Sequence, residues 1–320
     1  MIFLVYPTLP YKGIYLPFVV KQLHSPIKQK AFLYLMKELG YTQKEAQRLI
    51  AKGRLFVNGE VMDNQAGFVE GDFEFVCFEP LSKGLTPTFV APHFAIYDKP
   101  SGLIVHPQNR HTPYSLNDEI KHRFGHEANI THRIDQETSG LVLAARNKTS
   151  ERVLKMMFEE REVTKRYLAL VRGRVEHPMD IREPLLRRED QSSIIRMIVR
   201  VHPEGKPSRT FITPLEYFPD IDATLVEASP LTGRQHQIRV HLFHVKHPII
   251  GDPIYGQDER DAVRFLDKEM SDEERFVNTG ATRLLLHAYS LEFEYDANPY
   301  RIVSKEDFIK ECFEAMKLIY

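Results

Sequence analysis

Residues 132–146 read His-Arg-Ile-Asp-Gln-Glu-Thr-Ser-Gly-Leu-Val-Leu-Ala-Ala-Arg, and the rest of the chain is interpreted around this stretch. One carboxylate, Asp135, follows a cationic pair and precedes a turn of small residues at 138–140. The apolar run at 141–145 has the composition and length of a buried strand. A strand that begins beside a turn gives a reacting group a rigid support. Asp135 is therefore a candidate reactive carboxylate, and the alternative is an aspartate that only caps its turn.

Length and charge bound the class of protein. A chain of 320 residues exceeds the usual single domain, so two domains are expected. Its 43 basic and 44 acidic side chains leave a formal net charge of -1, which gives no overall signal for nucleic acid. Residues 21–54 nevertheless hold eight basic against two acidic side chains, whereas residues 255–320 hold nine against fifteen. The N-terminal part is thus better suited to face phosphate.

The cysteines and the start of the chain indicate where the protein works. Cys77 and Cys312 lie far apart without metal-binding or redox spacing, which fits a reducing compartment, although the two could pair. Residues 1–20 are apolar but interrupted by prolines, a lysine and a glycine, so neither a signal peptide nor a membrane span is expected. We expect a cytoplasmic protein that contacts no membrane.

Residues 28–80 are expected to form a small domain of two helices and a hairpin. Apolar residues at every third or fourth position predict a helix that ends at Gly40. Thr42 and Glu45 form a capping box that opens a second helix, and Asn58-Gly59 predicts a tight hairpin turn. Basic side chains recur along the second helix and its exit, at Lys44, Arg48, Lys52 and Arg54.

After a proline-containing linker at 81–92, short β-type runs dominate the chain. We expect strands at 94–97, 141–145, 167–171, 194–201, 223–228 and 284–286, and helices at 149–160 and 234–245. Strands interleaved irregularly with few helices favour an α+β domain over regular βαβ winding. The charge-rich residues 256–280 are expected to form a surface insertion, and Ser304 with Asp307 to cap a final helix.

The motif at 132–141 resembles the signature of the RluA-type pseudouridine synthases, His-Arg-Leu-Asp followed by Thr-Ser-Gly-Leu, with Ile134 replacing the leucine. Other stretches resemble the family in the same order, at 98–107, 164–171, 231–241, 247–252 and 284–288. The resemblance implies an α+β domain with a mixed, mainly antiparallel sheet at 93–303, a C-terminal helix at 304–320, and no metal or cofactor. It also implies an enzyme that isomerises uridine in structured RNA.

The small domain at 28–80 resembles the S4 RNA-binding module, with Lys30-Ala31-Phe32 where that module often has Arg-Leu-Asp. The resemblance implies an S4-like domain behind an N-terminal extension at 1–27, with the four basic residues of the second helix and its exit as RNA contacts. The alternative is a solvated helix face on an accessory domain.

The chemistry implied by the resemblance requires a particular set of side chains. Moving uracil from nitrogen to carbon attachment requires cleavage of a glycosidic bond, at which carboxylates act in glycosidases. Removal from water raises the pKa of a carboxylate, and an arginine within hydrogen-bond reach opposes this rise. The resemblance implies that Arg239 plays this part beside Asp135, with a phosphate clamp as the alternative. It also implies that Tyr167 stacks on the flipped base and takes a proton from it, with a core tyrosine as the alternative.

The resemblance further implies that Arg133 fills the space left by the flipped nucleotide and that Leu286 packs under the base. The complete set expected to bind RNA or substrate is His132, Arg133, Thr138, Arg234, His236, Gln237, Ile238 and Leu286. Salt-bridge or capping roles are the alternatives for His132, Arg234, His236 and Gln237. The histidines at 236, 241, 244 and 247 spread around a helix without a nearby cysteine or carboxylate, so a metal site is not favoured.

We therefore predict a cytoplasmic, monomeric RNA pseudouridine synthase that needs no cofactor and acts on ribosomal rather than transfer RNA. Transfer RNA is the alternative substrate. Two other classes of protein are weighed against this prediction. One is a non-catalytic RNA-binding factor of ribosome assembly, and the other is a carboxylate-dependent hydrolase with Glu137 as its second acid.

Overall fold

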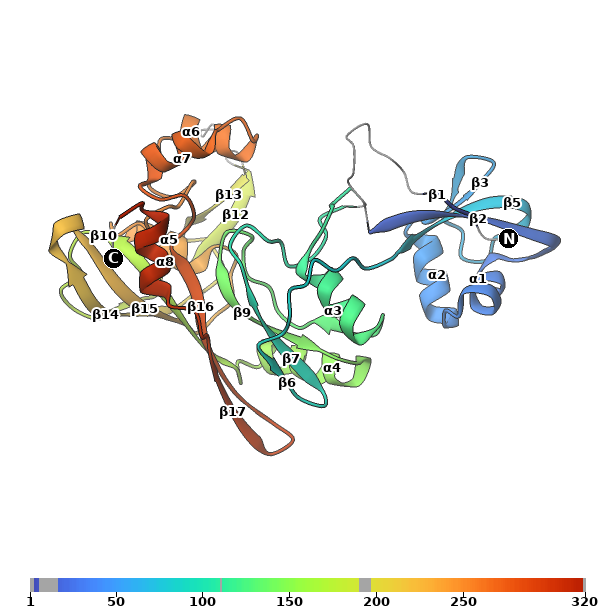
Figure 1. The fold of residues 1–320 in the computed structure, drawn as a ribbon, viewed down its shortest axis with the longest axis horizontal. Helices are drawn as coiled ribbons and strands as arrows, with labels where there is room; N and C mark the ends of the chain where they lie inside the picture. Colours follow the sequence, from blue (N-terminus) through green and yellow to red (C-terminus); the bar gives the residue numbers. More distant parts are fainter. Residues whose placement is uncertain (1–2, 6–16, 110, 190–196, 319–320) are drawn as a thin grey trace. The chain divides into compact units, whose positions relative to one another are not determined.

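The computed structural model describes residues 3–5, 17–109, 111–189 and 197–318 of the chain. The chain divides into two compact units, drawn in Figure 1. The first comprises Met1–Gly84 and His106–His122, and the second comprises Leu85–Val105 and Arg123–Tyr320. Residues 106–122 thus belong to the N-terminal unit, although they fall inside the range expected for the catalytic domain. None of the helices in the described residues is both long and apolar enough to cross a membrane.

The first unit is a five-stranded sheet with two helices packed against it. The strands are β1 (Phe3–Val5), β2 (Phe18–Lys30), β3 (Leu55–Val57), β4 (Glu60–Met62) and β5 (Phe68–Phe78), in the order β1-β2-β5-β3-β4. Helices α1 (Ala31–Leu39) and α2 (Gln43–Ala51) bury Leu35 and Ile50 against Phe75. The helix stop at Gly40, the capping box and the hairpin are confirmed. The long strand β2 was not predicted.

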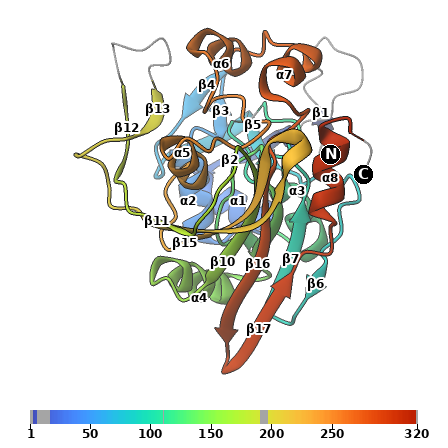
Figure 2. The same cartoon turned by 90° about the vertical axis from the view of Figure 1, so that its left-hand side faces the viewer.

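The second unit contains a large sheet in which almost every neighbouring pair is antiparallel. Its strands are β6 (Phe89–Val90), β7 (Phe94–Lys99), β8 (Asn129–Ile130), β9 (Ser139–Ala145), β10 (Thr164–Arg172), β11 (Met179–Ile181), β14 (Thr210–Phe218), β15 (Ala223–Pro230), β16 (Leu286–Tyr295) and β17 (Asn298–Val303). The main path runs β11-β14-β15-β10-β16-β9-β7-β6, with β17 beside β16 and β8 beside β9. Strands β12 (Leu185–Glu189) and β13 (Met197–Val201) form a separate hairpin that projects from the unit in Figure 2. A mixed, mainly antiparallel α+β fold is confirmed.

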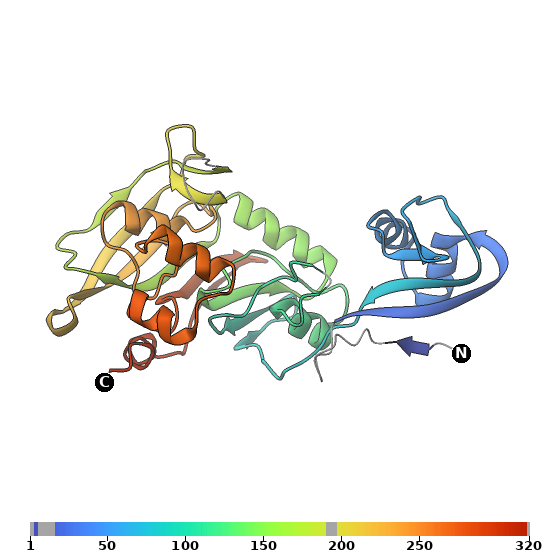
Figure 3. The ribbon, with the colours of Figure 1, turned by 90° about the horizontal axis from the view of Figure 1, so that it is seen from above.

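Three helices of this unit, α4 (Lys148–Glu159), α5 (Gln237–His244) and α8 (Phe308–Ala315), pack apolar side chains against the sheet. The unit also contains α6 (Glu259–Leu266), α7 (Asp272–Thr279) and a 3-10 turn at Pro219–Ile221, whereas most of α3 (Leu116–Phe124) belongs to the first unit. In Figure 3, α4 lies as a green helix along the sheet, where Leu154 packs with Leu141 and Leu143 of β9. A second apolar cluster joins α5 and α8 to β10 and β15 through residues such as Leu170 and Leu242.

Several expected boundaries differ from the structure. The strand expected at 284–286 begins only at Leu286 and extends to Tyr295, because Leu285 instead exchanges backbone hydrogen bonds with the segments of Ile250 and Leu170. The strand expected at 194–201 is described only from Met197 onward, since residues 190–196 lie outside the described residues. The helix expected from residue 234 begins at Gln237.

The predicted cap of the final helix is wrong in one residue. Asp307 accepts the backbone N–H of Lys310 and caps α8. Ser304 instead donates its hydroxyl to the Asp98 carboxylate, at the end of β7. The expected surface insertion at 256–280 contains two helices, α6 and α7, and α7 contacts residues of the site described below.

The central pairing of the sheet joins three distant segments. Strand β16 is antiparallel to β10, with Ala288 opposite Tyr167, and parallel to β9, with Ala288 opposite Gly140. Gly140 has a φ of 106°, and a Cβ atom there would lie 2.4 Å from the carbonyl oxygen of Ala288. Only glycine permits both this backbone conformation and this close approach. Tyr167 is thereby placed on the strand next but one to the Asp135 turn.

We expect Gly140→Ala to destabilise the protein much more than Gly102→Ala. Gly102 also has a positive φ, of 84°, but a Cβ atom there meets open space. Backbone strain alone costs about 1–3 kcal/mol, and the clash at Gly140 should add roughly 1–3 kcal/mol more. Urea unfolding of the two variants measures the difference. Equal losses of stability would show that the close β9–β16 contact does not depend on glycine.

Candidate active site

A buried lysine, Lys99, is hydrogen-bonded to the turn that carries Asp135. Lys99, at the end of β7, donates from Nζ to the carbonyl oxygens of Pro100 (3.0 Å), Leu103 (2.7 Å) and Gln136 (3.0 Å). Burial lowers the pKa of Lys99 to about 7, against the opposing charges of Glu137 and Asp135. Lys99 lies in the 98–107 motif, but its bond to the Asp135 turn was not predicted.

Further bonds tie the same turn to residues 101–102. Ser101 donates its hydroxyl to the carbonyl oxygen of Glu137 at 2.6 Å. Gly102 donates its N–H to the Gln136 carbonyl at 2.9 Å, and the Gln136 amide returns a bond to the Gly102 carbonyl at 3.0 Å. The backbone around Asp135 therefore has little freedom. Its side chain nevertheless keeps 26% of its surface exposed, so its oxygens remain accessible.

The structure brings Arg239 to Asp135. The guanidinium of this buried helix residue donates from Nε and Nη2 to the two oxygens of Asp252, at 2.7 and 2.8 Å. Its Nη1 lies 3.4 Å from Oδ2 of Asp135. Burial lowers the pKa of Arg239, but the charge and hydrogen bonds of Asp252, with a further contribution from Asp135, more than offset this and raise it above its ordinary value. A permanent positive charge thus faces the accessible carboxylate.

Asp252 and Tyr255 complete this group, and neither was predicted as a site residue. Asp252 is fully buried and also accepts the backbone N–H groups of Ile254 and Tyr255. The Tyr255 ring lies under the Arg239 guanidinium, with a centroid distance of 5.1 Å. The signal that could have identified Asp252 is its place at the end of the 247–252 motif. A buried carboxylate requires a cationic partner, and Arg239 is that partner.

His236 lies beside the same carboxylate, and its imidazole is neutral at pH 7. It precedes α5 with a φ of 54°, contacts the Tyr255 hydroxyl at 2.9 Å through Nδ1, and places Nε2 3.8 Å from Asp135. Burial, and then the charge of Arg239, lower the pKa of His236 to about 4. Because both ring nitrogens face groups of the protein, this geometry favours a place beside Asp135 over phosphate binding.

Tyr167 projects from β10 in the row that includes Ala288 and Gly140. It is partly buried and packs against the apolar cluster of the sheet. Burial, and then the negative charge of Asp135, raise the pKa of Tyr167 well above its usual value. Tyr167 therefore stays a neutral phenol near the Asp135 carboxylate.

Four of the residues expected to bind RNA are buried in the protein. Gln237 accepts from Thr232 and from the Arg234 backbone, and donates to the Arg209 carbonyl and to Thr210. Its amide is thus fully used in shaping the turn into α5. The other three are Thr138, Ile238 and Leu286. Their burial favours a role in the fold over direct contact with RNA.

His132 is likewise engaged within the protein. Its Nε2 accepts the backbone N–H of Leu143 at 2.9 Å, and its ring stacks on Phe158 at 4.3 Å. Burial, and then the charge of Lys165, lower the pKa of His132 to about 3. The geometry therefore favours the capping alternative. Arg133 by contrast is exposed, and Arg234 is partly exposed, with Nε 3.3 Å from the Pro207 carbonyl.

The predicted basic stripe of the first unit lies partly on the surface. Lys44, Arg48 and Lys52 of α2 and its end are exposed. Arg54 is less exposed, and its guanidinium lies over the Phe18 ring at 4.4 Å. Three of the four predicted side chains are therefore available for contact with a phosphate backbone.

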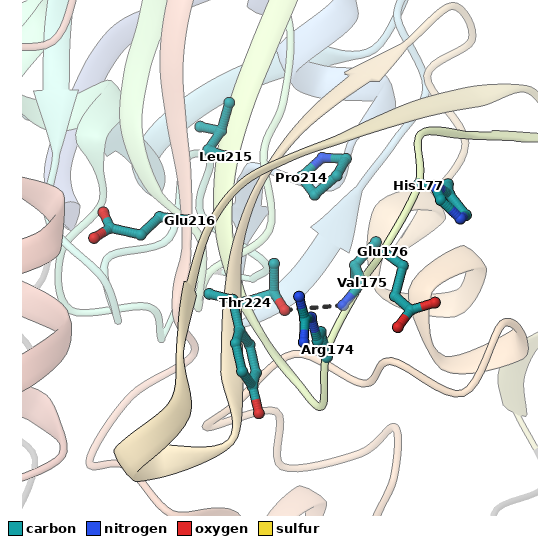
Figure 4. A pocket seen from close by; sticks show the side chains of 9 residues that line it. Arg174, Val175, Glu176, His177, Pro214, Leu215, Glu216 and Thr224 are labelled. Carbon is teal, nitrogen blue, oxygen red and sulfur yellow. Dashed lines mark hydrogen bonds between the residues drawn. The ribbon is translucent and has the colours of Figure 1, made fainter.

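Other candidate sites offer less chemistry. The second unit also has a hollow of about 440 Å³, and none of its lining residues is a predicted site residue. Figure 4 shows the side chains that line it, which are those of Arg174, Val175, Glu176, His177, Pro214, Leu215, Glu216, Tyr217 and Thr224. Its lining includes a structural hydrogen bond from the Val175 N–H to the Thr224 hydroxyl. In the described part of the chain, no group of three or more His, Cys, Asp or Glu side chains is arranged to hold a metal ion.

Comparison with known proteins agrees with these motifs. Residues 93–244 match the family model described as RNA pseudouridylate synthase. The chain is similar to an uncharacterized RNA pseudouridine synthase of Helicobacter pylori (strain J99), with 36% identity over 289 residues, 90% of this chain and 96% of that protein. It is also similar to ribosomal large subunit pseudouridine synthase C of Haemophilus influenzae, with 34% identity over 83% of each chain. The solved structure of human RNA Pseudouridylate Synthase Domain Containing 1 superposes with a TM-score of 0.56 and 26% identity, covering 73% of this chain and 89% of the human one.

The lowered pKa of His132, whose ring is bonded and stacked within the protein, predicts a dependence of stability on pH. In the unfolded chain a histidine binds a proton below about pH 6.5, whereas the native pKa of His132 is about 3. The unfolded state therefore binds more protons between these values, and native stability falls as the pH drops. His132→Gln should reduce the loss of unfolding free energy between pH 7 and pH 5 by about 1–2 kcal/mol. Urea unfolding at both pH values measures this loss. An equal loss of unfolding free energy in the variant and the wild type would contradict the neutral state of His132 in the native protein.

Proposed function

Because this chain belongs to the RluA-type RNA pseudouridine synthase family, and is thus an isomerase acting on RNA, we propose that Asp135 is its catalytic carboxylate. The observation that supports this most is the contact of the accessible Asp135 with Arg239, whose own orientation is fixed by buried Asp252. A carboxylate that faces a fixed positive charge is oriented before the substrate arrives.

The reaction assigns distinct tasks to the other groups. The bond between the sugar and uracil nitrogen breaks, the uracil turns, and a bond to carbon forms in its place. That carbon loses a proton and the freed nitrogen gains one, so the net change is an isomerisation. Asp135 acts at the glycosidic bond, as carboxylates do in glycosidases. Arg239 orients the Asp135 carboxylate through Nη1.

Tyr167 is proposed to stack on the flipped uracil. Its place in the row with Ala288 and Gly140 sets a flat ring on the strand next but one to the Asp135 turn. Stacking offsets part of the cost of extruding a base, which is a few kcal/mol. Burial and the charge of Asp135 raise the pKa of Tyr167, so the ring proposed to stack is a neutral phenol.

The hydrolase alternative lacks its second acid. Glu137 is paired with Arg275 at 2.5 Å and is mostly buried, so it is not free to activate water. Because the chain belongs to a family of enzymes, a non-catalytic assembly factor is no longer an alternative.

We propose structured ribosomal RNA as the substrate, since relatives similar over most of this chain are named ribosomal large subunit pseudouridine synthase C. Exposed Arg133 and partly exposed Arg234 would contact phosphates near the site. The S4-like domain at 28–80 would hold the RNA through Lys44, Arg48 and Lys52. Such contacts position RNA by its backbone and shape. We also propose that the protein is a cytoplasmic monomer and that it uses no metal.

Asp135→Asn should abolish pseudouridine formation while RNA affinity stays within a few-fold. Loss of a group at the reaction centre lowers the rate by about 10³-fold or more, whereas the amide preserves the shape of the carboxyl group. The measurement is pseudouridine mapping on large-subunit ribosomal RNA transcribed in vitro, with filter binding on the same RNA. The same change at exposed Asp220, in the 3-10 turn, serves as control and should leave the rate unchanged. Isomerisation that survives in Asp135→Asn would refute the catalytic assignment.

The S4-like contacts are tested by replacing Lys44, Arg48 and Lys52 together with glutamine. We expect weaker RNA binding and a salt dependence of log K that is shallower by up to roughly one per lost phosphate contact. The rate at saturating RNA should not change. The matched control replaces three exposed lysines of the acid-rich C-terminal part, Lys268, Lys305 and Lys310. An equal effect in both triple variants would show that the α2 stripe has no special role.

A further inference from the structure

The charge-rich segment at 256–280 reaches the candidate active site through one side chain. Arg275, in α7, donates from Nη2 to Oε2 of Glu137 at 2.5 Å and approaches the carbonyl oxygen of Gly251 at 3.3 Å. The side chains of Arg275 and Glu137 are only 11% and 16% exposed. An ion pair so far removed from water is much less screened than a surface pair.

The two partners of Arg275 lie on the turns that carry Asp135 and Asp252. Glu137 follows Asp135 by two residues, on the turn that carries the proposed catalytic carboxylate. Gly251 directly precedes Asp252, whose carboxylate holds Arg239. One guanidinium therefore contacts both the turn that supplies the acid and the turn that orients its arginine.

Helices α6 and α7, which lie side by side in Figure 2, hold Arg275 in place. Its guanidinium lies over the Phe265 ring of α6, at 5.1 Å from the centroid. At the end of α7, the carbonyl oxygen of Thr279 accepts the backbone N–H of Gly251 at 3.1 Å. The helix is thus bonded directly to the turn that precedes Asp252.

The bonds on the other side of the Asp135 turn are of a different kind. Lys99, Ser101 and Gly102 all bond to its backbone carbonyl oxygens. Arg275 instead holds a side chain, from the direction of α7. Without Arg275, the turn would keep its support at residues 99–102, and only Arg239 would still join it to the Asp252 turn.

We propose that Arg275 is a positioning residue that, with Glu137, sets the distance between Asp135 and Arg239. Helix α7 then supports the active site through Arg275, so the segment at 256–280 is not only a surface insertion. This inference rests on the proposed catalytic role of Asp135. A displacement of about 1 Å in a reacting group can cost on the order of 10²-fold in rate, so loss of Arg275 should lower the catalytic rate and leave RNA affinity nearly unchanged.

The test compares Arg275→Gln, Arg275→Lys and Glu137→Gln in single-turnover assays on large-subunit ribosomal RNA transcribed in vitro. Arg275→Gln should slow pseudouridine formation at saturating RNA by about 10-fold or more, with the dissociation constant for RNA within about 2-fold. Arg275→Lys keeps the charge and should recover part of the rate. Glu137→Gln should match Arg275→Gln, and the double variant should be no slower than either, because the two side chains act as one unit.

A matched control lies in the same segment. Arg264 of α6 pairs with Glu274 of α7 at 2.7 Å, but these side chains are 39% and 44% exposed and contact neither turn of the site. Arg264→Gln should retain the wild-type rate. If Arg264→Gln lowered the catalytic rate as much as Arg275→Gln does, the cause would be a general loosening of the two helices. That result would overturn the proposal.

The outcomes separate this inference from the proposed function. If wild-type protein is active, Asp135→Asn is inactive and Arg275→Gln is as fast as wild type, the positioning role is refuted and the role of Asp135 stands. If Asp135→Asn is active, the proposed function itself fails. Melting temperatures verify folding in every case. If Arg275→Gln does not fold, Arg275→Lys decides, because a wild-type rate in that variant would show that the bonds of the guanidinium are not needed.

Discussion

The site depends on one buried guanidinium shared between two carboxylates. Arg239 gives two donors to fully buried Asp252 and turns a third toward accessible Asp135. Taking an arginine out of water is costly unless its charge and donors are satisfied. Asp252 satisfies the charge and two donors of Arg239. With the guanidinium fixed in this way, Nη1 points toward Asp135. The structure thus separates the acid that orients Arg239 from the acid that remains accessible to substrate.

The sheet decides what lies around this ion group. Strand β16 comes late in the chain but lies between β9 and β10, so it joins the Asp135 turn to the strand of Tyr167. The contact is close because Gly140 allows the Ala288 backbone to approach. Loops from both sides then complete the site, with Lys99 holding the backbone of the turn and Arg275 holding its Glu137 side chain.

Local rules predicted the elements whose signals lie within a few residues. The Thr42–Glu45 capping box, the Gly40 helix stop and the Asn58-Gly59 hairpin were all found. Longer elements were harder to delimit. Strand β2 was not predicted, because its pairing with β5 is interrupted by a bulge between Ser25 and Gln29 that breaks the alternating pattern.

Sequence alone made Asp135 a candidate reactive carboxylate, because its motif combines a carboxylate, a turn of small residues and a buried strand within fifteen positions. It could not say which polar side chains near it remain available. Gln237 and His132 look the same in sequence whether they face RNA or the protein, yet the fold satisfies both internally. Asp252 and Arg275 acquire their roles from partners 13 and 138 residues away. Burial and pairing across such separations are properties of the assembled core, and hydrogen-bond partners there are chosen by packing rather than by neighbours along the chain.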